Sequence, residues 1–278
     1  MNVSKAGKIW LDYHKTHSKK ATVRAYEWVL NKFCEKFGGH DLKELLPDEI
    51  LTFLNLITNG RKSQTKRVRF AHLTAFFNFI KNNIDPDINN PCHLPMLRKL
   101  FRQKTTTYWD MIGKETVDEI IFRTTMVRNR LMLELMARGG MRIGEVLKLT
   151  PYDIQDCKLL LRDPKSGREQ EIIFIPQKVA NRLKAYIRTN KIDDNQRIFP
   201  ICYEAARIMV MKAGNMVSIH LRPHDLRRHA ATFASRSGVP IEIVSKIILR
   251  HKNLSTTQRY LGKISDTEAM RWIENLYS

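Results

Sequence analysis

The sequence has no apolar run that approaches the roughly 18 residues of a membrane-spanning helix. Residues 1–15 contain no apolar core of a secretory signal, so nothing there predicts export. Cysteines are few, stand far apart and form no CxxC pair, which argues against a structural zinc site and a disulfide scaffold. We therefore expect a soluble protein of the reducing cytoplasm with no membrane partner. The four cysteines are Cys34, Cys92, Cys157 and Cys202.

Acidic residues are also scarce. The 278 residues include 48 Lys+Arg and 28 Asp+Glu, which gives a formal net charge of +20. Residues 1–104 and residues 105–278 each carry a net +10, so the excess is not confined to one tail. A polyanion, and first of all nucleic acid, is the expected partner. Charge alone fits a merely basic protein as well.

No acidic residue lies between Ile50 and Ile84, and the most basic stretch falls in this window. Residues 61–69 read RKSQTKRVR, and apolar residues then recur at helical spacing up to Ile80. The pattern predicts one helix with a cationic beginning and an apolar stripe, which could lie on a DNA backbone. A solvated basic face explains it equally well. The candidate DNA contacts are Arg61, Lys62, Lys66, Arg67 and Arg69.

The order of breaks and periodic stretches predicts two domains. Apolar residues from Val23 to Phe37 step by three and four, which is typical of an amphipathic helix, and a double glycine ends it. The asparagine- and proline-rich stretch 82–95 interrupts any helix. We expect a helical domain over residues 1–90, a linker over 91–112, and a second domain over 113–278 with a tail from about residue 263.

The second domain is expected to contain the only strands. Gly139-Gly140 predicts a sharp turn before a short helix at 142–147. Two strand-like runs, 158–162 and 171–175, are joined by a Pro- and Gly-containing segment, which predicts a hairpin with Lys165 near its tip. Helical patterns follow Pro176. The predicted fold class is mainly α with a small antiparallel β-sheet.

Six side chains together suggest chemistry on a phosphodiester. Two arginines can hold the oxygens of one phosphate, and a lysine can protonate a leaving alkoxide. A histidine can transfer a proton, and a tyrosine phenol can attack phosphorus. No carboxylate cluster for Mg²⁺ accompanies them, so we expect neither a metal nor another cofactor. These residues are Arg142, Lys165, His224, Arg227, His251 and Tyr260.

Four blocks resemble the tyrosine recombinases, also called the phage integrase family, and in size the chain is similar to the Xer-like, simple two-domain integrases. The blocks are GGMRIGEVLKL (139–149), PKSG followed by EIIFIP (164–176), HDLRRHAATFA (224–234) and GVPIEIVSKIILRHKNLSTTQRYLG (238–262). They occur in the order of the family and cover most of residues 113–278. Residues 1–90 resemble the helical core-binding domain of the family by a weaker pattern.

The resemblance implies a role for each matching residue. Arg142 and Arg227 would grip the scissile phosphate, and Lys165 would protonate the departing 5′-oxygen. The remaining members of the set would act as follows: His224 would assist proton transfer, His251 would hydrogen-bond a non-bridging oxygen, Tyr260 would attack phosphorus, and Glu145 would support the site from behind.

The sequence departs from the family pattern at two positions, and two neighbouring residues have simpler explanations. Arg250 stands where many relatives have glycine, and its effect is open from the sequence. Arg227 is chosen over Arg228 because it lies three residues after His224. Asp225 reads as a helix-start residue. His229, five residues after His224, faces away from it on a helix, which weakens a metal site.

The resemblance implies a site-specific recombinase that forms a covalent 3′-phosphotyrosyl intermediate without ATP or metal. It would integrate or excise a mobile element, or resolve chromosome dimers, at the nucleoid. Its partners would be double-stranded DNA, its own copies in a tetramer with exchanged C-terminal tails, and accessory proteins. A type IB-like topoisomerase and a non-catalytic DNA-binding accessory protein remain the alternatives.

Overall fold

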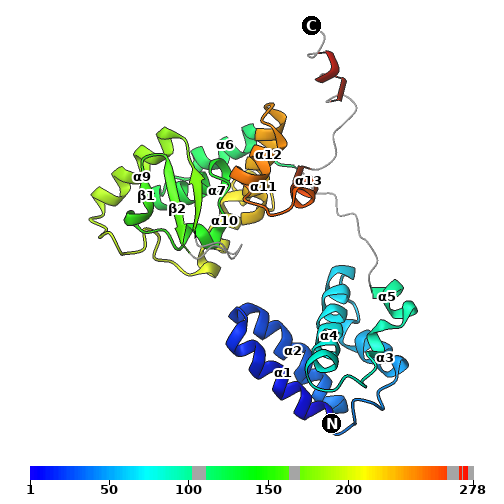
Figure 1. Cartoon of the computed structure of the whole chain (residues 1–278). Helices are drawn as coiled ribbons and strands as arrows, with labels where there is room; N and C mark the ends of the chain where they lie inside the picture. Colours follow the sequence, from blue (N-terminus) through cyan, green and yellow to red (C-terminus); the bar gives the residue numbers. More distant parts are fainter. Residues whose placement is uncertain (102–110, 163–169, 262–268, 271, 275–278) are drawn as a thin grey trace. The chain divides into compact units, whose positions relative to one another are not determined.

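The computed structural model describes the chain apart from residues 102–110, 163–169, 262–268, 271 and 275–278 (Figure 1). The chain divides into two compact units, Met1–Thr107 and Tyr108–Ser278. Each unit encloses an apolar core of its own. The fold is mainly helical with one small antiparallel sheet, so the predicted fold class is confirmed.

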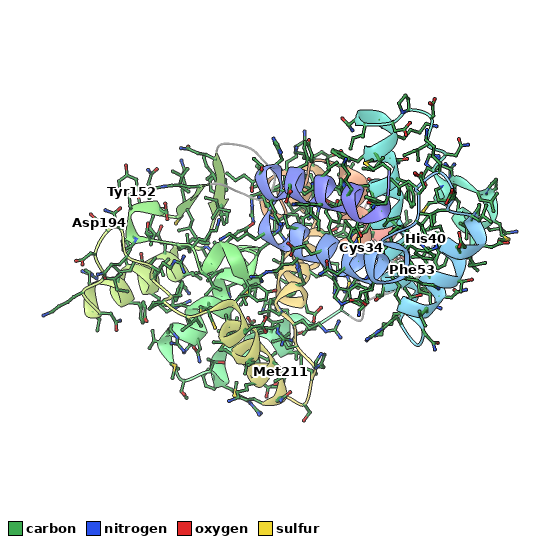
Figure 2. The ribbon with its side chains drawn as sticks, turned by 90° about the horizontal axis from the view of Figure 1, so that it is seen from below. Cys34, His40, Phe53, Tyr152, Asp194 and Met211 are labelled. Carbon is green, nitrogen blue, oxygen red and sulfur yellow. The ribbon has the colours of Figure 1, made fainter. Side chains whose placement is uncertain are left out.

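The first unit is built from helices alone in its described part. Its four longer helices are packed pairwise around a core rich in aromatic side chains. Phe33 contacts the rings of Phe53 and Phe77 at 5.1 and 6.0 Å between centroids. Figure 2 labels Phe53 and Cys34 among these helices. The helices are α1 (Val3–His17), α2 (Lys20–Phe37), α3 (Pro47–Thr58) and α4 (Ser63–Asn83).

Helix α4 confirms the expected basic, amphipathic helix. It begins at Ser63, so the first two cations of the basic stretch precede it. The residues of the predicted apolar stripe face the core, where Phe70, Leu73, Phe77 and Ile80 are buried. Burial of such large side chains stabilises each by about 1.5–3 kcal/mol relative to exposure. The apolar stripe therefore fixes which face of α4 remains on the surface.

The segment expected to begin the linker instead packs on the first unit. Residues 91–101 form the 3₁₀ turn η1 (Pro91–His93) and helix α5 (Pro95–Phe101). Leu97 and Phe101 lie four residues apart on α5 and both are buried, and the Phe101 ring stacks on Phe70. The prolines start these two turns rather than excluding helix. The rest of the expected linker falls largely outside the described residues.

The second unit surrounds helix α7 with other helices and the sheet. Helix α11 and helix α9 both pack on α7. The elements up to the sheet are α6 (Lys114–Arg123), α7 (Val127–Arg138), α8 (Ile143–Val146) and the 3₁₀ turn η2 (Pro151–Asp153). After the sheet come α9 (Gln177–Thr189), α10 (Tyr203–Asn215), α11 (Pro223–Arg236), α12 (Ile241–Ile243), the π-helical segment η3 (Val244–Ile248) and α13 (Leu254–Leu261).

The sheet contains the expected hairpin and one strand that the sequence did not reveal. Strands β2 (Lys158–Arg162) and β3 (Gln170–Phe174) pair antiparallel, with Leu159 opposite Ile173. The additional strand β1 (Ile154–Gln155) pairs with β2 and is too short to show alternation. The turn that holds Lys165 lies outside the described residues. The strands on either side of it are nonetheless fixed against the core.

The double glycine after α7 makes the predicted sharp turn. Gly140 has φ of +60°, a backbone conformation that side chains with Cβ rarely adopt. A Cβ at this position would also come within 2.9 Å of the backbone oxygen of Ile248. Glycine is therefore required twice over, by conformation and by space. The close approach brings the start of α8 beside the end of η3.

No helix in the described part of the second or the first unit is long and apolar enough to cross a membrane.

Candidate active site

Arg142 and Glu145 lie together at the start of α8. Arg142 directly precedes the helix, and Glu145 is its third residue. The Glu145 carboxylate accepts the backbone N–H of Arg142 at 2.8 Å and the guanidinium Nη1–H at 2.5 Å. The first bond satisfies one of the free N–H groups at the helix start. The second bond fixes the direction of the Arg142 guanidinium.

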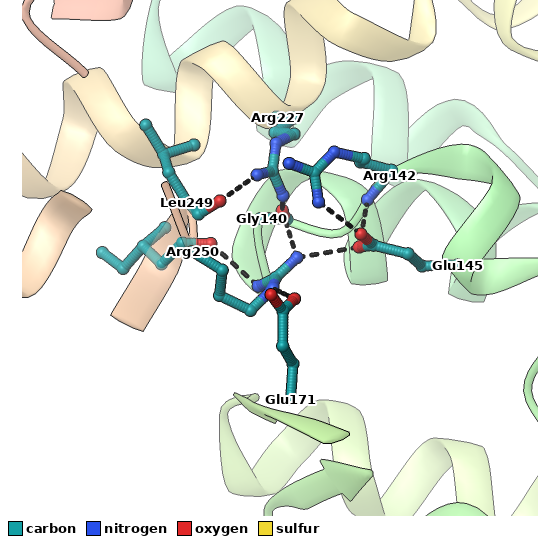
Figure 3. A network of polar contacts seen from close by, with 8 residues as sticks. Gly140, Arg142, Glu145, Glu171, Arg227, Leu249 and Arg250 are labelled. Atoms are coloured by element: carbon teal, nitrogen blue, oxygen red, sulfur yellow. Dashed lines mark hydrogen bonds and ion pairs between the residues drawn. The ribbon is translucent and has the colours of Figure 1, made fainter. Parts of the chain in front are cut away.

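Arg227 is the most deeply buried charged group of the site, with 0% of its surface exposed. It projects from α11, and its guanidinium donates to the carbonyl oxygens of Gly140 and Leu249 (Figure 3). Gly140 belongs to the turn after α7, and Leu249 directly follows η3. One side chain therefore joins three segments that lie far apart in the sequence.

Arg250 occupies the centre of the same network (Figure 3). Its side chain is buried, and its Nη2 donates to Glu145 Oε2 at 2.8 Å. Its Nε lies 3.2 Å from Oε2 of Glu171, a buried residue of β3. Its Nη1 donates to the carbonyl oxygen of Ile248 at 2.9 Å. The residue whose effect the sequence left open thus bridges two buried carboxylates.

The arginines keep the shared carboxylate ionised. Burial acts to raise the pKa of Glu145, but the charge of Arg250, the backbone bond and charge of Arg142, and the charge of Arg227 outweigh it. The pKa of Glu145 therefore lies below its ordinary value. Burial lowers the pKa of Arg250, while the two glutamates oppose that shift. A guanidinium starts so high that it stays charged at neutral pH.

His251 follows Arg250 and is held by a chain of hydroxyl groups. Its Nδ1 lies 3.0 Å from Oγ1 of Thr257, which donates to Oγ of Ser245 at 2.8 Å. Both hydroxyl residues are buried. Burial lowers the pKa of His251 to about 4, and the charges of Arg227, Arg142 and Arg250 act in the same direction. The imidazole is therefore neutral at neutral pH and lies within the field of the three arginines.

The remaining residues of the predicted set lie around this centre or outside the described part. His224 is exposed in the first turn of α11, one turn before Arg227. Tyr260 lies near the end of α13, a helix that packs against α11 and η3. The side chain of Tyr260, like the whole of Lys165, lies outside the described residues. The structure therefore brings together Arg142, Glu145, Arg227 and His251.

The neighbouring residues of α11 have structural roles. Asp225 accepts the backbone N–H of Arg222 at 2.9 Å, so it caps the helix start as expected. Arg228 pairs with Asp225 at 3.0 Å. His229 hydrogen-bonds the Ile112 carbonyl at 3.0 Å and stacks on Phe233. Among all described residues, no group of three or more His, Cys, Asp or Glu side chains could hold a metal ion.

The basic stretch of the first unit separates into surface cations and one packed arginine. Arg61, Lys62 and Arg67 are exposed, and Lys66 is partly so. The Arg69 guanidinium instead lies 3.9 Å from the centroid of the Trp28 ring and donates to the Ala25 carbonyl at 3.4 Å. Burial lowers the pKa of Arg69, with a smaller effect from Arg61. Arg69 thus helps to hold α4 against α2.

Three residues of the site were not singled out from the sequence. They are Glu171, Thr257 and Ser245. For Glu171 a signal was present. It alternates with Ile173 and Ile175 in a predicted strand, so its side chain shares their buried face. A carboxylate at a buried strand position requires a cationic partner. The hydroxyl residues gave no comparable signal.

Comparisons with known proteins identify the family. The model of the phage integrase family matches residues 113–265. Tyrosine recombinase XerA of Saccharolobus solfataricus is 28% identical over 260 residues, covering 88% of this chain and 83% of that protein. A tyrosine recombinase of Thermosipho africanus is 26% identical over 289 residues, covering 96% of both chains.

Solved structures share the fold at lower identity. The Tn1549 transposon integrase in complex with a circular intermediate DNA superposes with a TM-score of 0.74 at 16% identity and covers 99% of both chains. A lambda integrase dimer bound to a COC′ core site gives a TM-score of 0.74 at 15% identity, covering 96% of this chain and 81% of that one.

The family match spans more than half of the chain and contains the whole arginine network as well as Tyr260. Curated relatives over most of its length are tyrosine recombinases. The protein is an enzyme of DNA recombination, and the chain belongs to the phage integrase family of tyrosine recombinases.

Proposed function

We propose that this recombinase cuts and rejoins DNA at specific sites through a 3′-phosphotyrosyl intermediate, with Tyr260 as nucleophile. The observation that carries the proposal is the convergence of Arg142, Arg227 and His251 beside the helix that carries Tyr260. Two guanidinium groups, together with an imidazole that becomes a second donor when an anion favours its protonation, match the oxygens of one phosphodiester. The arrangement suits positioning and charge stabilisation, the two requirements of phosphoryl transfer.

The proposed cleavage step balances as follows. The Tyr260 phenolic oxygen forms a bond to phosphorus, and the bond from phosphorus to the 5′-oxygen breaks. Lys165 gives a proton to the departing 5′-oxygen, and His224 assists proton transfer by accepting the phenolic proton of Tyr260. Arg142, Arg227 and His251 hold the non-bridging oxygens; the anionic phosphate favours a proton on the ring nitrogen that faces away from Thr257. In the reverse step a second 5′-hydroxyl attacks the phosphotyrosine and rejoins the strand, without ATP or a metal.

Covalent capture tests the nucleophile. Wild-type protein and Tyr260→Phe would be mixed with nicked duplexes tiled from the DNA that flanks the gene, in EDTA. An adduct that resists SDS is expected with wild type alone, because the nick lets the short 5′-strand leave and traps the phosphotyrosine. The position of the adduct would locate the site. Its placement at a mobile-element end or at a chromosome-dimer site would distinguish the two biological roles.

The matched control in this experiment is Tyr203→Phe, since Tyr203 is an exposed tyrosine at the start of α10. It should form the adduct at the wild-type rate. An adduct of equal yield in Tyr260→Phe, or none in wild type at an independently mapped binding site, would contradict the proposal.

The first unit is proposed to hold double-stranded DNA through the basic start of α4. The solved relatives named above are complexes with DNA, and Arg61, Lys62, Lys66 and Arg67 present cations on the surface. Removal of one phosphate contact should reduce the slope of log affinity against log salt by about 0.9. Titrations of Arg67→Ala at several salt concentrations measure this. Arg69→Ala serves as the comparison, because Arg69 packs on Trp28; an unchanged slope in Arg67→Ala contradicts the assignment.

Recombination of two duplexes requires four cleavages, so a tetramer on DNA is proposed, in which each C-terminal tail docks on a neighbouring copy. The tail from about residue 263 lies mostly outside the described residues; its described Met270 and Ile273 are exposed apolar side chains. Deletion of residues 265–278 should preserve binding of one protomer and prevent synapsis in gel-shift experiments. Normal assembly and recombination by the truncated protein would exclude tail exchange. Accessory proteins would bias the direction of recombination at the nucleoid.

A further inference from the structure

Arg250 has a backbone conformation that disfavours its own side chain. Its φ is +51°, in the left-handed region, which is unfavourable for a residue with a Cβ atom. Glycine would occupy this position without strain. The guanidinium is nevertheless buried, with 5% of the residue exposed, and is bound to two carboxylates. The strain is thus retained together with a specific set of contacts.

The contacts connect the phosphate-holding side of the site with the sheet. Glu145 divides its carboxylate between two arginines, with Oε1 on Arg142 Nη1 and Oε2 on Arg250 Nη2. The Nε atom of Arg250 lies 3.2 Å from Oε2 of Glu171. Glu171 lies opposite Leu161 in the β2–β3 hairpin, next to the last described residue pair, Arg162 and Gln170. A single guanidinium therefore lies between α8 and β3.

We propose that Arg250 is a positioning residue for the scissile phosphate. It holds Glu145 against β3, so that the Arg142 guanidinium is directed at the phosphate. This inference rests on the proposed function of Arg142. Glu145 without Arg250 would have Arg142 as its nearest cation and could turn toward it. Arg142 would then share more of its charge with the carboxylate and less with DNA. A misplacement of about 1 Å is enough to cost a factor of 100 in such sites.

The electrostatics of the network support this division of roles. Arg250 is the leading charge that keeps Glu145 ionised, ahead of Arg142. The carboxylate is therefore neutralised from its buried side as well as by Arg142. Arg142, with a quarter of its side chain exposed, stays accessible to a ligand, whereas Arg250 is shielded from one. Arg250 accordingly acts through its neighbours and does not touch DNA.

The test measures how strongly the protein senses the charge of the scissile phosphate. Nicked duplexes from the capture experiment would be prepared with a normal phosphodiester or an uncharged methylphosphonate at the cleavage position. Affinities would be compared in full-length Tyr260→Phe, which binds without cleaving. Loss of a charge-assisted contact should weaken binding of the methylphosphonate roughly tenfold or more. The ratio of the two affinities is the readout, so a general loss of binding cancels.

Four further variants in the Tyr260→Phe background decide the matter. Arg142→Ala should lower the ratio several-fold, and Arg227 would retain the remainder. Arg250→Gly, which relieves the backbone strain, should lower the ratio nearly as far. The double variant Arg250→Gly with Glu171→Gln should stay low, although it removes the unpaired buried carboxylate. Arg182→Ala breaks an ion pair with the buried Glu134 outside the network and should keep the full ratio.

The outcomes separate the inference from the function on which it rests. If Tyr260→Phe itself shows no preference, or if Arg142→Ala keeps the full preference, the assignment of Arg142 fails. If Arg142→Ala lowers the preference and Arg250→Gly retains it, the role of Arg250 is refuted. Recovery of the ratio in the double variant would show that Arg250 only neutralises Glu171, which also overturns the inference.

Discussion

Replacement of Arg227 by lysine should slow single-turnover strand cleavage by about 10²–10³-fold, the cost of removing one preorganised donor from a transition state. Lysine keeps the charge but has no planar fork of donors. It cannot satisfy the Gly140 and Leu249 carbonyls together and still face a phosphate. The rate at which the SDS-resistant adduct forms on a nicked duplex, with protein in excess, measures the effect.

The adjacent residue provides the matched control. Arg228→Lys should stay within a few-fold of wild type, because the Arg228 guanidinium pairs with Asp225 and lysine can replace that pair. A larger defect in Arg228→Lys than in Arg227→Lys would show that the phosphate is held by the other member of the doubled arginine.

Glu145→Ala is expected to lower both stability and cleavage. Removal of one partner from a buried ion pair typically costs about 3–5 kcal/mol, because the opposite charge is left without compensation. Here Arg142 and Arg250 would lose their shared carboxylate at once. Urea unfolding followed by circular dichroism measures the stability. The adduct rate, measured where the variant is fully folded, should still be lower than wild type by about tenfold or more.

A second buried carboxylate separates stability from chemistry. Glu134 in α7 is buried and pairs with Arg182 and Arg138, outside the arginine network. Glu134→Ala should destabilise the protein by a comparable amount and leave the adduct rate of folded protein unchanged. Equal loss of cleavage in both variants would mean that Glu145 contributes only to folding.

Local patterns were sufficient to predict the elements of the fold. Two strand-like runs on either side of a Pro- and Gly-containing segment identified β2 and β3. Helical spacing identified α2 and α4 with the correct buried face. The two-residue strand β1 and the short helix α5 were missed, because segments this short do not show a hydrophobic periodicity. For α5, the prolines that mark a break in a helix also mark the start of one.

The site was predictable where neighbours in sequence are neighbours in space. Arg142 and Glu145 meet across one helical turn, and Asp225 caps its own helix. The contact between Arg250 and Glu171 depends instead on the packing of η3 against the strand β3. No spacing along the chain encodes that approach. The position of Glu171 on the buried face of the strand could have revealed that its carboxylate needs a cationic partner. It could not have revealed which residue is that partner.

The buried network of arginines and glutamates carries a net positive charge. Three guanidinium groups, from Arg142, Arg227 and Arg250, lie with two carboxylates, and His251 adds no charge at neutral pH. One unit of positive charge is therefore left within a poorly solvated cluster. A phosphodiester carries one negative charge, so a bound DNA strand would balance the cluster. The substrate would then act as the counter-ion of the network, and by linkage its binding would stabilise the second unit.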